Sequence, residues 1–422
     1  MASAWMFVAA TAWGGCGDDD GHASSGGSGD GSGSSSGGSS SGVTATDSAS
    51  SSVGTASSST TDVDPDSSGT HGSSSTGGPD DPFGEPLSVP LPVELVPLAL
   101  ALADVDGDGV LDLVVTGTAN SVVAASTLLG DGAGGFGAPV DGTVPACSAF
   151  PVVGDVDGDA RADLFYGTCE GDGVFARGQA DGSFVAANVL APWTEPPVRS
   201  SRFTDHDGDG DDDLVMLTVD GATVRLHVAS ADGGATWPLT TTTLTGSGGD
   251  FNGLDVARTD ADVTAAVLLD ADSAAAWTIA DGDGWGAVAG LPFTLVPTSL
   301  EVVDLDGDGV HEILGASRGE RSVQLVAQGG GTPVASPAID TTVDPFDIVV
   351  GNHADVLAII DDDEPTLALL QLAADGTVAP LSERTLLAPA VRVLAGDLDG
   401  DGDDDLVAAT FAAGAVTVLL AQ

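Results

Sequence analysis

The sequence predicts an all-β protein arranged as a seven-bladed β-propeller of repeats of about 50 residues. Three observations lead to this class. From residue 81 onward, short apolar runs alternate with Gly- and Asp-rich turns, which favours strands over helices. One ten-residue acidic motif occurs five times, at spacings of about 50 residues or about twice that distance. Partial repeat units stand at both ends of residues 81–422, as expected for an array that closes into a ring.

Residues 1–16 are predicted to be a targeting segment. A short apolar stretch from Met6 to Ala12 leads into Trp13, two glycines and Cys16. This order resembles a bacterial lipoprotein signal, in which small residues precede a cysteine that becomes the lipidated N-terminus. Trp13 stands where that family usually has Leu, and no Lys or Arg precedes the apolar stretch. We expect lipidation of Cys16; an ordinary secretory signal and an incidental cysteine are the alternatives.

Residues 17–80 are predicted to be a disordered linker. They consist largely of Ser, Gly, Thr and Asp, and such a composition cannot bury a core. Random-coil scaling gives some 60 residues a reach of roughly 45 Å. If Cys16 carries a lipid, this segment is a tether between membrane and folded domain; otherwise it is a linker with no anchoring role.

Residues 81–422 are predicted to form the propeller, with a strand before and after each acidic motif. Leu98–Val105 and Leu113–Thr116 flank the first copy in this way. The runs after the motif are apolar at successive positions, which indicates strands buried on both faces. They are too short and too closely bounded by glycine to be helices.

The acidic motif is a candidate calcium loop with the pattern Asp-x-Asp-Gly-Asp-(Gly/Ala)-x-x-(Asp/Glu)-(Leu/Ile). Carboxylates at positions 1, 3, 5 and 9 and the backbone carbonyl of position 7 can converge on one hard cation. Asp-Gly turns without metal are the alternative, but clustered carboxylates repel one another unless they are neutralised. We expect three to five Ca²⁺ ions with a structural role. The predicted ligand residues are Asp104, Asp106, Asp108, Val110 and Asp112; Asp155, Asp157, Asp159, Arg161 and Asp163; Asp205, Asp207, Asp209, Asp211 and Asp213; Asp304, Asp306, Asp308, Val310 and Glu312; and Asp397, Asp399, Asp401, Asp403 and Asp405.

The copies are not equivalent. Ala160 replaces the glycine at position 6 of the second copy, and a non-glycine residue at positive φ costs roughly 1–2 kcal/mol, so this site should be weaker. Glu312 replaces the aspartate at position 9 of the copy that starts at Asp304. Two doubled spacings predict degenerate, metal-free units near residues 250–262 and 347–355.

The two ends of the propeller region match each other. Phe83-Gly84-Glu85-Pro86 repeats the pattern of Phe136-Gly137-Ala138-Pro139, which precedes the second motif. The last unit is short and ends with the strand-like run Val416–Leu420. The N-terminal strand is therefore predicted to complete the last blade, which would hide the open sheet edges.

The acidic loops, together with turns such as Gly130–Gly137, resemble the FG-GAP/VCBS repeat family. This is the propeller type of integrin alpha-chain heads and of many secreted bacterial proteins, and the resemblance covers about residues 83–422. It implies a calcium ion in the loop between the first two strands of a blade. It also implies a role in binding or adhesion outside the cell.

The amino-acid composition limits the classes of molecule that the chain is expected to bind. The chain has a formal charge of −54 and no lysine, so nucleic acid is a poor partner and anionic membranes are disfavoured. Membrane contact is expected only through a lipid at Cys16.

Cys147 and Cys169 flank the second motif and either form a disulfide or remain two buried thiols. Pairing of Val153 with Leu164 would bring them close.

No catalytic constellation is evident. Residues 315–319 match Gly-x-Ser-x-Gly but fall between predicted strands, whereas a nucleophile elbow needs a strand-to-helix turn. His206 and His311 lie at non-ligand positions of the loops and are expected to be exposed.

We expect a monomeric, secreted or cell-envelope binding module for an unknown extracellular protein or glycan, not an enzyme. The alternatives are a propeller-based polysaccharide lyase or hydrolase and a structural cell-surface component.

Overall fold

The computed structural model describes residues 81–422 in short, interrupted stretches. The residues left out are 1–80, 93–94, 120–121, 143–147, 169–172, 191–197, 221–222, 232–236, 246–253, 259–261, 271–272, 281–288, 328–332, 353–355, 374–376 and 411–413. The regular structure of the described residues is entirely β, without helix. The predicted all-β class is confirmed.

The strands form antiparallel sheets of consecutive strands, numbered here from 1 to 7 in chain order. Sheet 1 contains β2 (Leu95–Ala103), β3 (Asp112–Ala119), β4 (Val122–Leu128) and β5 (Val140–Gly142); sheet 2 contains β6 (Ser148–Gly154), β7 (Asp163–Thr168), β8 (Gly173–Gly178) and β9 (Phe184–Leu190). Sheet 3 contains β10 (Val198–Thr204), β11 (Asp213–Asp220), β12 (Thr223–Ala229) and β13 (Leu239–Thr245); sheet 4 contains β14 (Leu254–Arg258), β15 (Asp262–Asp270), β16 (Ser273–Ala280) and β17 (Ala289–Gly290). Sheet 5 contains β18 (Ser299–Val303), β19 (Glu312–Ser317), β20 (Ser322–Ala327), β21 (Val334–Ala335) and β22 (Ile339–Asp340); sheet 6 contains β23 (Asp347–Gly351), β24 (Val356–Ile360), β25 (Thr366–Leu372) and β26 (Val378–Thr385). Sheet 7 contains β27 (Ala390–Gly396), β28 (Asp405–Thr410), β29 (Ala415–Leu419) and, from the start of the described chain, β1 (Leu87–Pro90).

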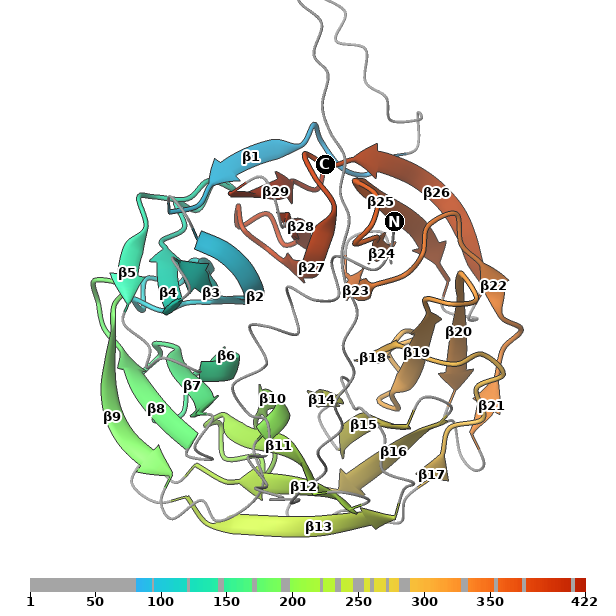
Figure 1. Cartoon of the computed structure of the whole chain (residues 1–422), viewed down its shortest axis with the longest axis horizontal. Coiled ribbons are helices and arrows are strands. Elements are labelled where there is room, and N and C mark those ends of the chain that lie inside the picture. The colour runs from blue at the N-terminus through green and yellow to red at the C-terminus, as the bar shows by residue number, and fades with distance from the viewer. Residues whose placement is uncertain are drawn as a thin grey trace, which may run out of the picture. The chain divides into compact units, whose positions relative to one another are not determined.

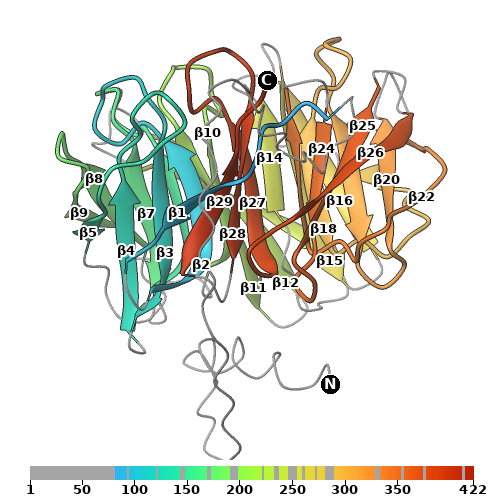
Figure 2. The same cartoon turned by 90° about the horizontal axis from the view of Figure 1, so that it is seen from above.

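The sheets stand around a common centre, as in a β-propeller (Figure 1). The first strand of each sheet lies nearest the centre, and the later strands lie progressively further out. Seen from the side, the strands run between the two faces of the ring (Figure 2). In sheet 2 the register places Val153 opposite Leu164, the pairing considered from the sequence.

The middle strands are apolar on both faces because each sheet is packed between two neighbours. β24 and β28 are buried along their whole length. Full burial of one Leu, Ile or Val side chain contributes about 1.5–3 kcal/mol. The predicted strands buried on both sides are therefore confirmed, and these strands read as continuous rather than alternating apolar runs.

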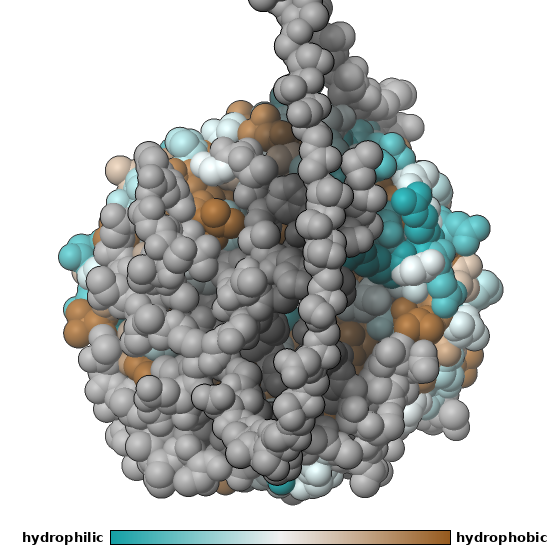
Figure 3. Space-filling model, in the orientation of Figure 1, coloured by the Kyte–Doolittle hydropathy of each residue, from teal (hydrophilic) through white to brown (hydrophobic). Residues whose placement is uncertain are grey.

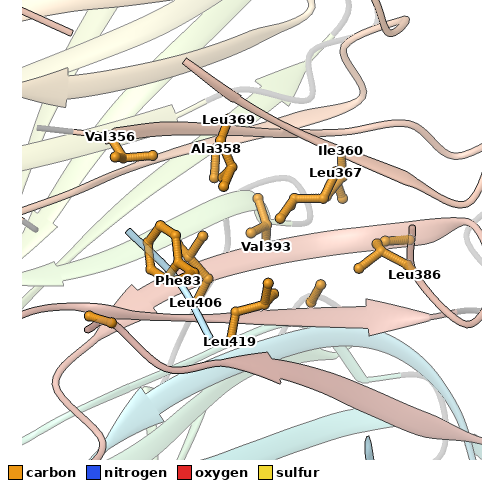
Figure 4. Packing of buried hydrophobic residues seen from close by; sticks show 13 residues of the cluster. Phe83, Val356, Ala358, Ile360, Leu367, Leu369, Leu386, Val393, Leu406 and Leu419 are labelled. Atoms are coloured by element: carbon orange, nitrogen blue, oxygen red, sulfur yellow. The ribbon is translucent and has the colours of Figure 1, made fainter. Parts of the chain in front are cut away.

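An apolar cluster fills every junction between consecutive sheets, including the junction of sheet 7 with sheet 1. Representative pairs, in ring order, are Val114 with Val153, Phe165 with Leu214, Leu226 with Val267, Ala266 with Ile313, Leu325 with Leu357, Leu369 with Leu406, and Leu113 with Val407. Figure 4 shows the cluster between sheets 6 and 7, in which Phe83 packs beside Leu406 and Leu419.

The N-terminal part of the described chain is fastened to its C-terminal part. β1 pairs with β29 in antiparallel register, Leu87 opposite Val418. Phe83 is 4% exposed and forms a bridge with Ala421. The buried guanidinium of Arg384 donates to the carbonyl oxygen of Phe83 and lies 2.8 Å from a carboxylate oxygen of Asp81.

Carboxylates on the central strands join neighbouring sheets. Asp255 on β14 accepts the backbone N–H of Val302 on β18 at 2.8 Å. Asp347 on β23 repeats this contact with Val393 on β27 at 3.1 Å. Glu301 lies on β18, between these two strands in ring order (Figure 1). Two of these carboxylates are also paired with arginines of neighbouring first strands, Asp255 with Arg202 on β10 and Asp347 with Arg392 on β27.

Hydrophilic residues gather on one side of the face shown in Figure 3, the side of β20, β22 and β26. In this part of the ring, Arg318 lies in the turn between β19 and β20. Its Nη2 atom lies 2.5 Å from Asp362 Oδ1 and 3.4 Å from Asp363 Oδ2, and its guanidinium lies over the ring of Phe346. This cluster joins sheets 5 and 6 through charge as well as apolar packing.

Candidate metal centres

The five acidic motifs form loops between the first and second strands of their sheets. They are named here after the sheets: loop 1 (104–113), loop 2 (155–164), loop 3 (205–214), loop 5 (304–313) and loop 7 (397–406). The loops occupy equivalent positions in repeated sheets, so they lie on one face of the ring. In sheets 4 and 6 the same strands are joined by only a few residues, 259–261 and 352–355.

The aspartate at position 1 organises each loop by accepting backbone N–H groups. In loop 1, Asp104 Oδ1 accepts from Gly107 at 2.7 Å and Asp108 at 3.1 Å, and Asp104 Oδ2 accepts from Gly109 at 2.8 Å. The chain thus wraps around one carboxylate, which satisfies local donors in the absence of regular structure.

The wrapping requires positive φ at positions 4 and 6. Gly107 has φ 82° and Gly109 has φ 86°. At position 6 of loop 2, Ala160 adopts φ 61°, as its place in the motif predicted. Left-handed backbone is strained for alanine, at a cost of roughly 1–2 kcal/mol.

The carboxylate at position 9 is buried and ties the loop to the rest of its sheet. Asp112 is 1% exposed. Its Oδ2 accepts the N–H of Val105 at 2.9 Å, and its Oδ1 accepts the N–H of Gly130, beyond the third strand, at 2.8 Å. Asp213 and Asp405 make the same two contacts in loops 3 and 7. This residue therefore connects three strands of the sheet.

Each loop brings three carboxylates together. One oxygen from each lies within 4.8 Å of the other two, a spacing that a single cation can bridge. The groups are Asp104, Asp106 and Asp108; Asp155, Asp157 and Asp159; Asp205, Asp207 and Asp213; Asp304, Asp306 and Asp308; and Asp397, Asp399 and Asp405. At position 7 the backbone N–H of Val110, Arg161, Asp211, Val310 and Asp403 donates to the carboxylate at position 5.

The oxygens at position 3 test whether these groups suit a cation. Asp399 Oδ1 in loop 7 and Asp157 Oδ1 in loop 2 are buried and have no hydrogen-bond partner among the described residues. Such an atom costs free energy unless a ligand satisfies it. An all-oxygen, acidic donor set is the one that Ca²⁺ prefers. The residues of loop 7 therefore fit this ion, whereas in loop 2 the other carboxylate oxygen of Asp157 contacts Arg177.

The pKa values of the loop carboxylates also indicate sites suited to a cation. Burial, followed by the charges of neighbouring loop carboxylates, raises the pKa of Asp106, Asp112, Asp207 and Asp405. Burial raises the pKa of Asp213 to about 7, and Asp207 adds to this effect. Several negative charges are thus held together against their repulsion, and a bound cation would relieve it.

Position 2 anchors the loop in the core. Val105 and Val156 are fully buried at this position, and Leu398 is 2% exposed. His206 occupies the same position in loop 3 and is also buried. At position 8 of loop 5, His311 is buried and its Nδ1 lies 3.0 Å from Thr264 Oγ1. The expectation that both histidines are exposed was wrong, because His206 takes the buried position 2 and His311 packs against Thr264 of the neighbouring sheet 4.

Neighbouring loops are joined by hydrogen bonds that sequence reasoning missed. Residues at position 8 donate backbone N–H groups to the position-1 carbonyl of the preceding loop, Ala162 to Asp104 at 2.7 Å and Asp212 to Asp155 at 2.8 Å. Asp404 of loop 7 exchanges two hydrogen bonds with Asn352 of sheet 6. No motif signals these contacts, since they depend on the placement of whole sheets.

The remaining predicted features fall in two groups. Cys16, Cys147 and Cys169 lie outside the described residues. Ser317 of the Gly-x-Ser-x-Gly match is the last residue of β19, is 1% exposed, and is followed by a turn into β20. This is a strand–turn–strand unit, without the helix that a nucleophile elbow requires.

Comparisons with known proteins agree with the geometry. Residues 104–166 and 155–216 match the family described as FG-GAP-like repeat. No curated protein sequence matches the chain. The described part of the chain holds no helix with the length and apolarity needed to span a bilayer.

Solved structures show the same fold at low identity. The BP39L lectin from Burkholderia pseudomallei is 12% identical, with a TM-score of 0.58 over 78% of this chain and 96% of that one. BBS1N, solved in complex with ARL6DN, is 13% identical, with a TM-score of 0.55 over 79% and 97%. The WD40 domain of Toxoplasma gondii coronin is 11% identical, with a TM-score of 0.50 over 79% and 88%.

The fold places the chain among β-propellers. The match of residues 104–216 and the repeated sheets support, more specifically, an FG-GAP repeat propeller.

Proposed function

We propose that the chain is an extracellular, calcium-stabilised β-propeller that acts as a binding or adhesion module. The observation that carries the proposal is the convergence of three carboxylates in each of five equivalent loops. Oxygen-only donor sets favour Ca²⁺ over transition metals. FG-GAP repeats also suggest a location outside the cell or at its surface.

The residues that would hold calcium are those at positions 1, 3, 5 and 9, with the carbonyl of position 7. A bound ion supplies positive charge that offsets the repulsion of these carboxylates. Because the position-9 carboxylate also accepts a backbone N–H from beyond the third strand, ion binding would fix both hairpins of a blade. This is a structural role, and we propose no catalytic step.

We further propose that the seven sheets are the blades of one closed ring, with β1 as the closing strand. Two observations support closure. β1 supplies the outer strand of sheet 7, giving it four strands. An apolar cluster also joins sheet 7 to sheet 1, as at the other junctions. A closed ring leaves no open sheet edge at its termini.

We propose that the ligand is an extracellular protein or a glycan, bound by a monomer. The shared fold accommodates both classes, since one structural neighbour is a lectin and another was solved with a protein partner. Attachment to a membrane would occur through a lipid at Cys16. Replacement of this residue, Cys16→Ser, should then release the protein into the soluble fraction.

The test of the calcium proposal is native mass spectrometry of the purified chain, with calcium and after chelation, combined with a thermal melt. We expect several bound ions and a large fall in melting temperature on chelation. An unchanged melt with no bound ion would mean that the loops are metal-free turns. Ligand screens against glycans and extracellular proteins would follow, with and without calcium.

A further inference from the structure

Loop 2 differs from the other loops because arginine side chains occupy its carboxylates. Arg177 on β8 contacts Asp157 Oδ2 through its Nη1 atom, and the same atom lies 3.5 Å from Asp163 Oδ2. Arg161 contacts Asp159 Oδ2 through Nη2. Three of the four predicted carboxylate ligands of loop 2 are therefore already paired with positive charge within the chain.

The residues equivalent to Arg177 in other sheets can be found from the backbone N–H group that donates to the position-9 carboxylate of each loop. Gly178, the next residue, donates its N–H to Asp163 at 2.9 Å. In sheets 1, 3 and 7 the corresponding donors are Gly130, Ala231 and Ala421, so the residues equivalent to Arg177 are Leu129, Ser230 and Leu420. In sheet 5 the strand register, Ile313 opposite Val326, assigns the place to Ala327. Loop 2 alone has a cationic side chain at this position.

The arginine near loop 3 has a different role. Arg258, on the neighbouring sheet, donates to the main-chain oxygen of Asp205, and its Nε lies 3.9 Å from Asp205 Oδ2. Arg258 thus contacts the position-1 residue of loop 3 from the neighbouring sheet 4. Arg177 instead reaches the carboxylates at positions 3 and 9, where an ion would have to bind.

The side chains around Arg177 explain why it suits this place. Asp163 is 2% exposed. A buried carboxylate needs a positive partner. A guanidinium attached to the chain supplies one without the entropy cost of capturing a free ion, and its planar donors match carboxylate geometry. A dication in loop 2 would have to displace Arg177 or sit beside its like charge.

We propose that loop 2 is closed by Arg177 instead of calcium, so that the chain binds one ion fewer than its five loops would allow. This rests on the proposed function, since it specifies which loops bind. It also gives the ring one blade that keeps its hairpin in order at low calcium. That blade stands between two ion-dependent ones, to which it is joined by the Ala162–Asp104 and Asp212–Asp155 backbone bonds.

The experiment is a count of bound calcium ions by native mass spectrometry on the full chain and on matched variants. Asp157→Asn in loop 2 is expected to leave the count unchanged, while the equivalent changes Asp106→Asn in loop 1 and Asp399→Asn in loop 7 each remove one ion. Arg177→Leu, which introduces the residue found in sheets 1 and 7, is expected to add one ion at millimolar calcium. Arg177→Lys keeps the charge and should add none.

The outcomes separate the two proposals. A wild-type chain with one ion in every loop, or loss of an ion on Asp157→Asn, overturns the inference while the proposed calcium function stands. A chain that binds no calcium overturns both. The Asp157→Asn comparison decides the question even if Arg177→Leu does not fold, because it leaves Arg177 in place.

Discussion

The buried histidine of sheet 3 should make the protein lose stability in mild acid. His227 is fully buried on β12, with Nε2 2.8 Å from Thr218 Oγ1 and Nδ1 2.9 Å from Thr241 Oγ1. A neutral ring can donate through one nitrogen and accept through the other, and hydroxyl groups satisfy both roles. Burial, and then the charge of Arg225, lowers the pKa of His227 from 6.5 to about 4.

The loss of folding stability in acid follows from the difference between the pKa values of His227 in the unfolded and folded states. A folded-state pKa below the unfolded value means that the stabilising contribution is fully present above about pH 6.5 and is lost as the pH falls. The loss reaches about 1 kcal/mol near pH 5.5 and about 3 kcal/mol below pH 4. His227→Gln removes the titration but also one hydrogen bond, a cost of about 1 kcal/mol at neutral pH.

The assay is urea unfolding of wild type and His227→Gln at pH 7.5 and 5.5, in saturating calcium. Wild type should be more stable by about 1 kcal/mol at pH 7.5, and the two proteins should be nearly equal at pH 5.5. Acid effects on the loops are common to both proteins and cancel in the difference. A stability gap that stays the same at the two pH values would refute the assignment of a buried, neutral His227.

Three further changes test other parts of the structure. Ala160→Gly should raise the melting temperature slightly, because relief of roughly 1–2 kcal/mol of left-handed strain exceeds the added flexibility of glycine in the unfolded chain; a lower melting temperature would contradict the strain. Burial, and then the carboxylates of Asp255 and Asp347, raises the pKa of Glu301 well above its usual value, so its contribution is present at low pH and lost as the pH rises. Glu301→Gln should therefore raise the melting temperature at pH 8 and change it little at pH 4.5, and an equal shift at both would disprove this reasoning. Phe83→Ala removes a buried ring from the cluster between sheets 6 and 7 and should cost about 3–5 kcal/mol in urea unfolding, whereas an unaffected protein would mean that the N-terminal segment is dispensable.

Local patterns were sufficient to predict the loops. The glycine at position 6 of the motif predicted a left-handed residue, and Ala160 adopts one even without glycine. The pairing of Val153 with Leu164, which was considered from the sequence, is the one observed, since Val153 and Leu164 lie on the two sides of one antiparallel hairpin. These features depend on residues close in sequence, where spacing and backbone geometry decide the outcome.

The features that sequence reasoning missed depend on neighbours distant in sequence. Arg177 lies on β8, the second strand after its loop, and only the pairing of β7 with β8 brings it to Asp157 and Asp163. His206 was expected to be exposed because its neighbours in the motif are acidic. It is buried because it takes position 2, where Val105 and Val156 are also buried, and the acidic motif does not reveal this.

The loops of sheets 1, 2 and 3 form a connected series, which bears on how calcium would act. The carbonyl of Asp104 accepts from loop 2, and the carbonyl of Asp155 accepts from loop 3. The same two residues hold their own loops together through their carboxylates. A cation that orders the carboxylate of Asp104 therefore also fixes an acceptor for the next blade. Calcium removal from loop 1 should consequently loosen the junction between sheets 1 and 2 as well as its own hairpin, and a permanently closed loop 2 would limit how far that loosening spreads.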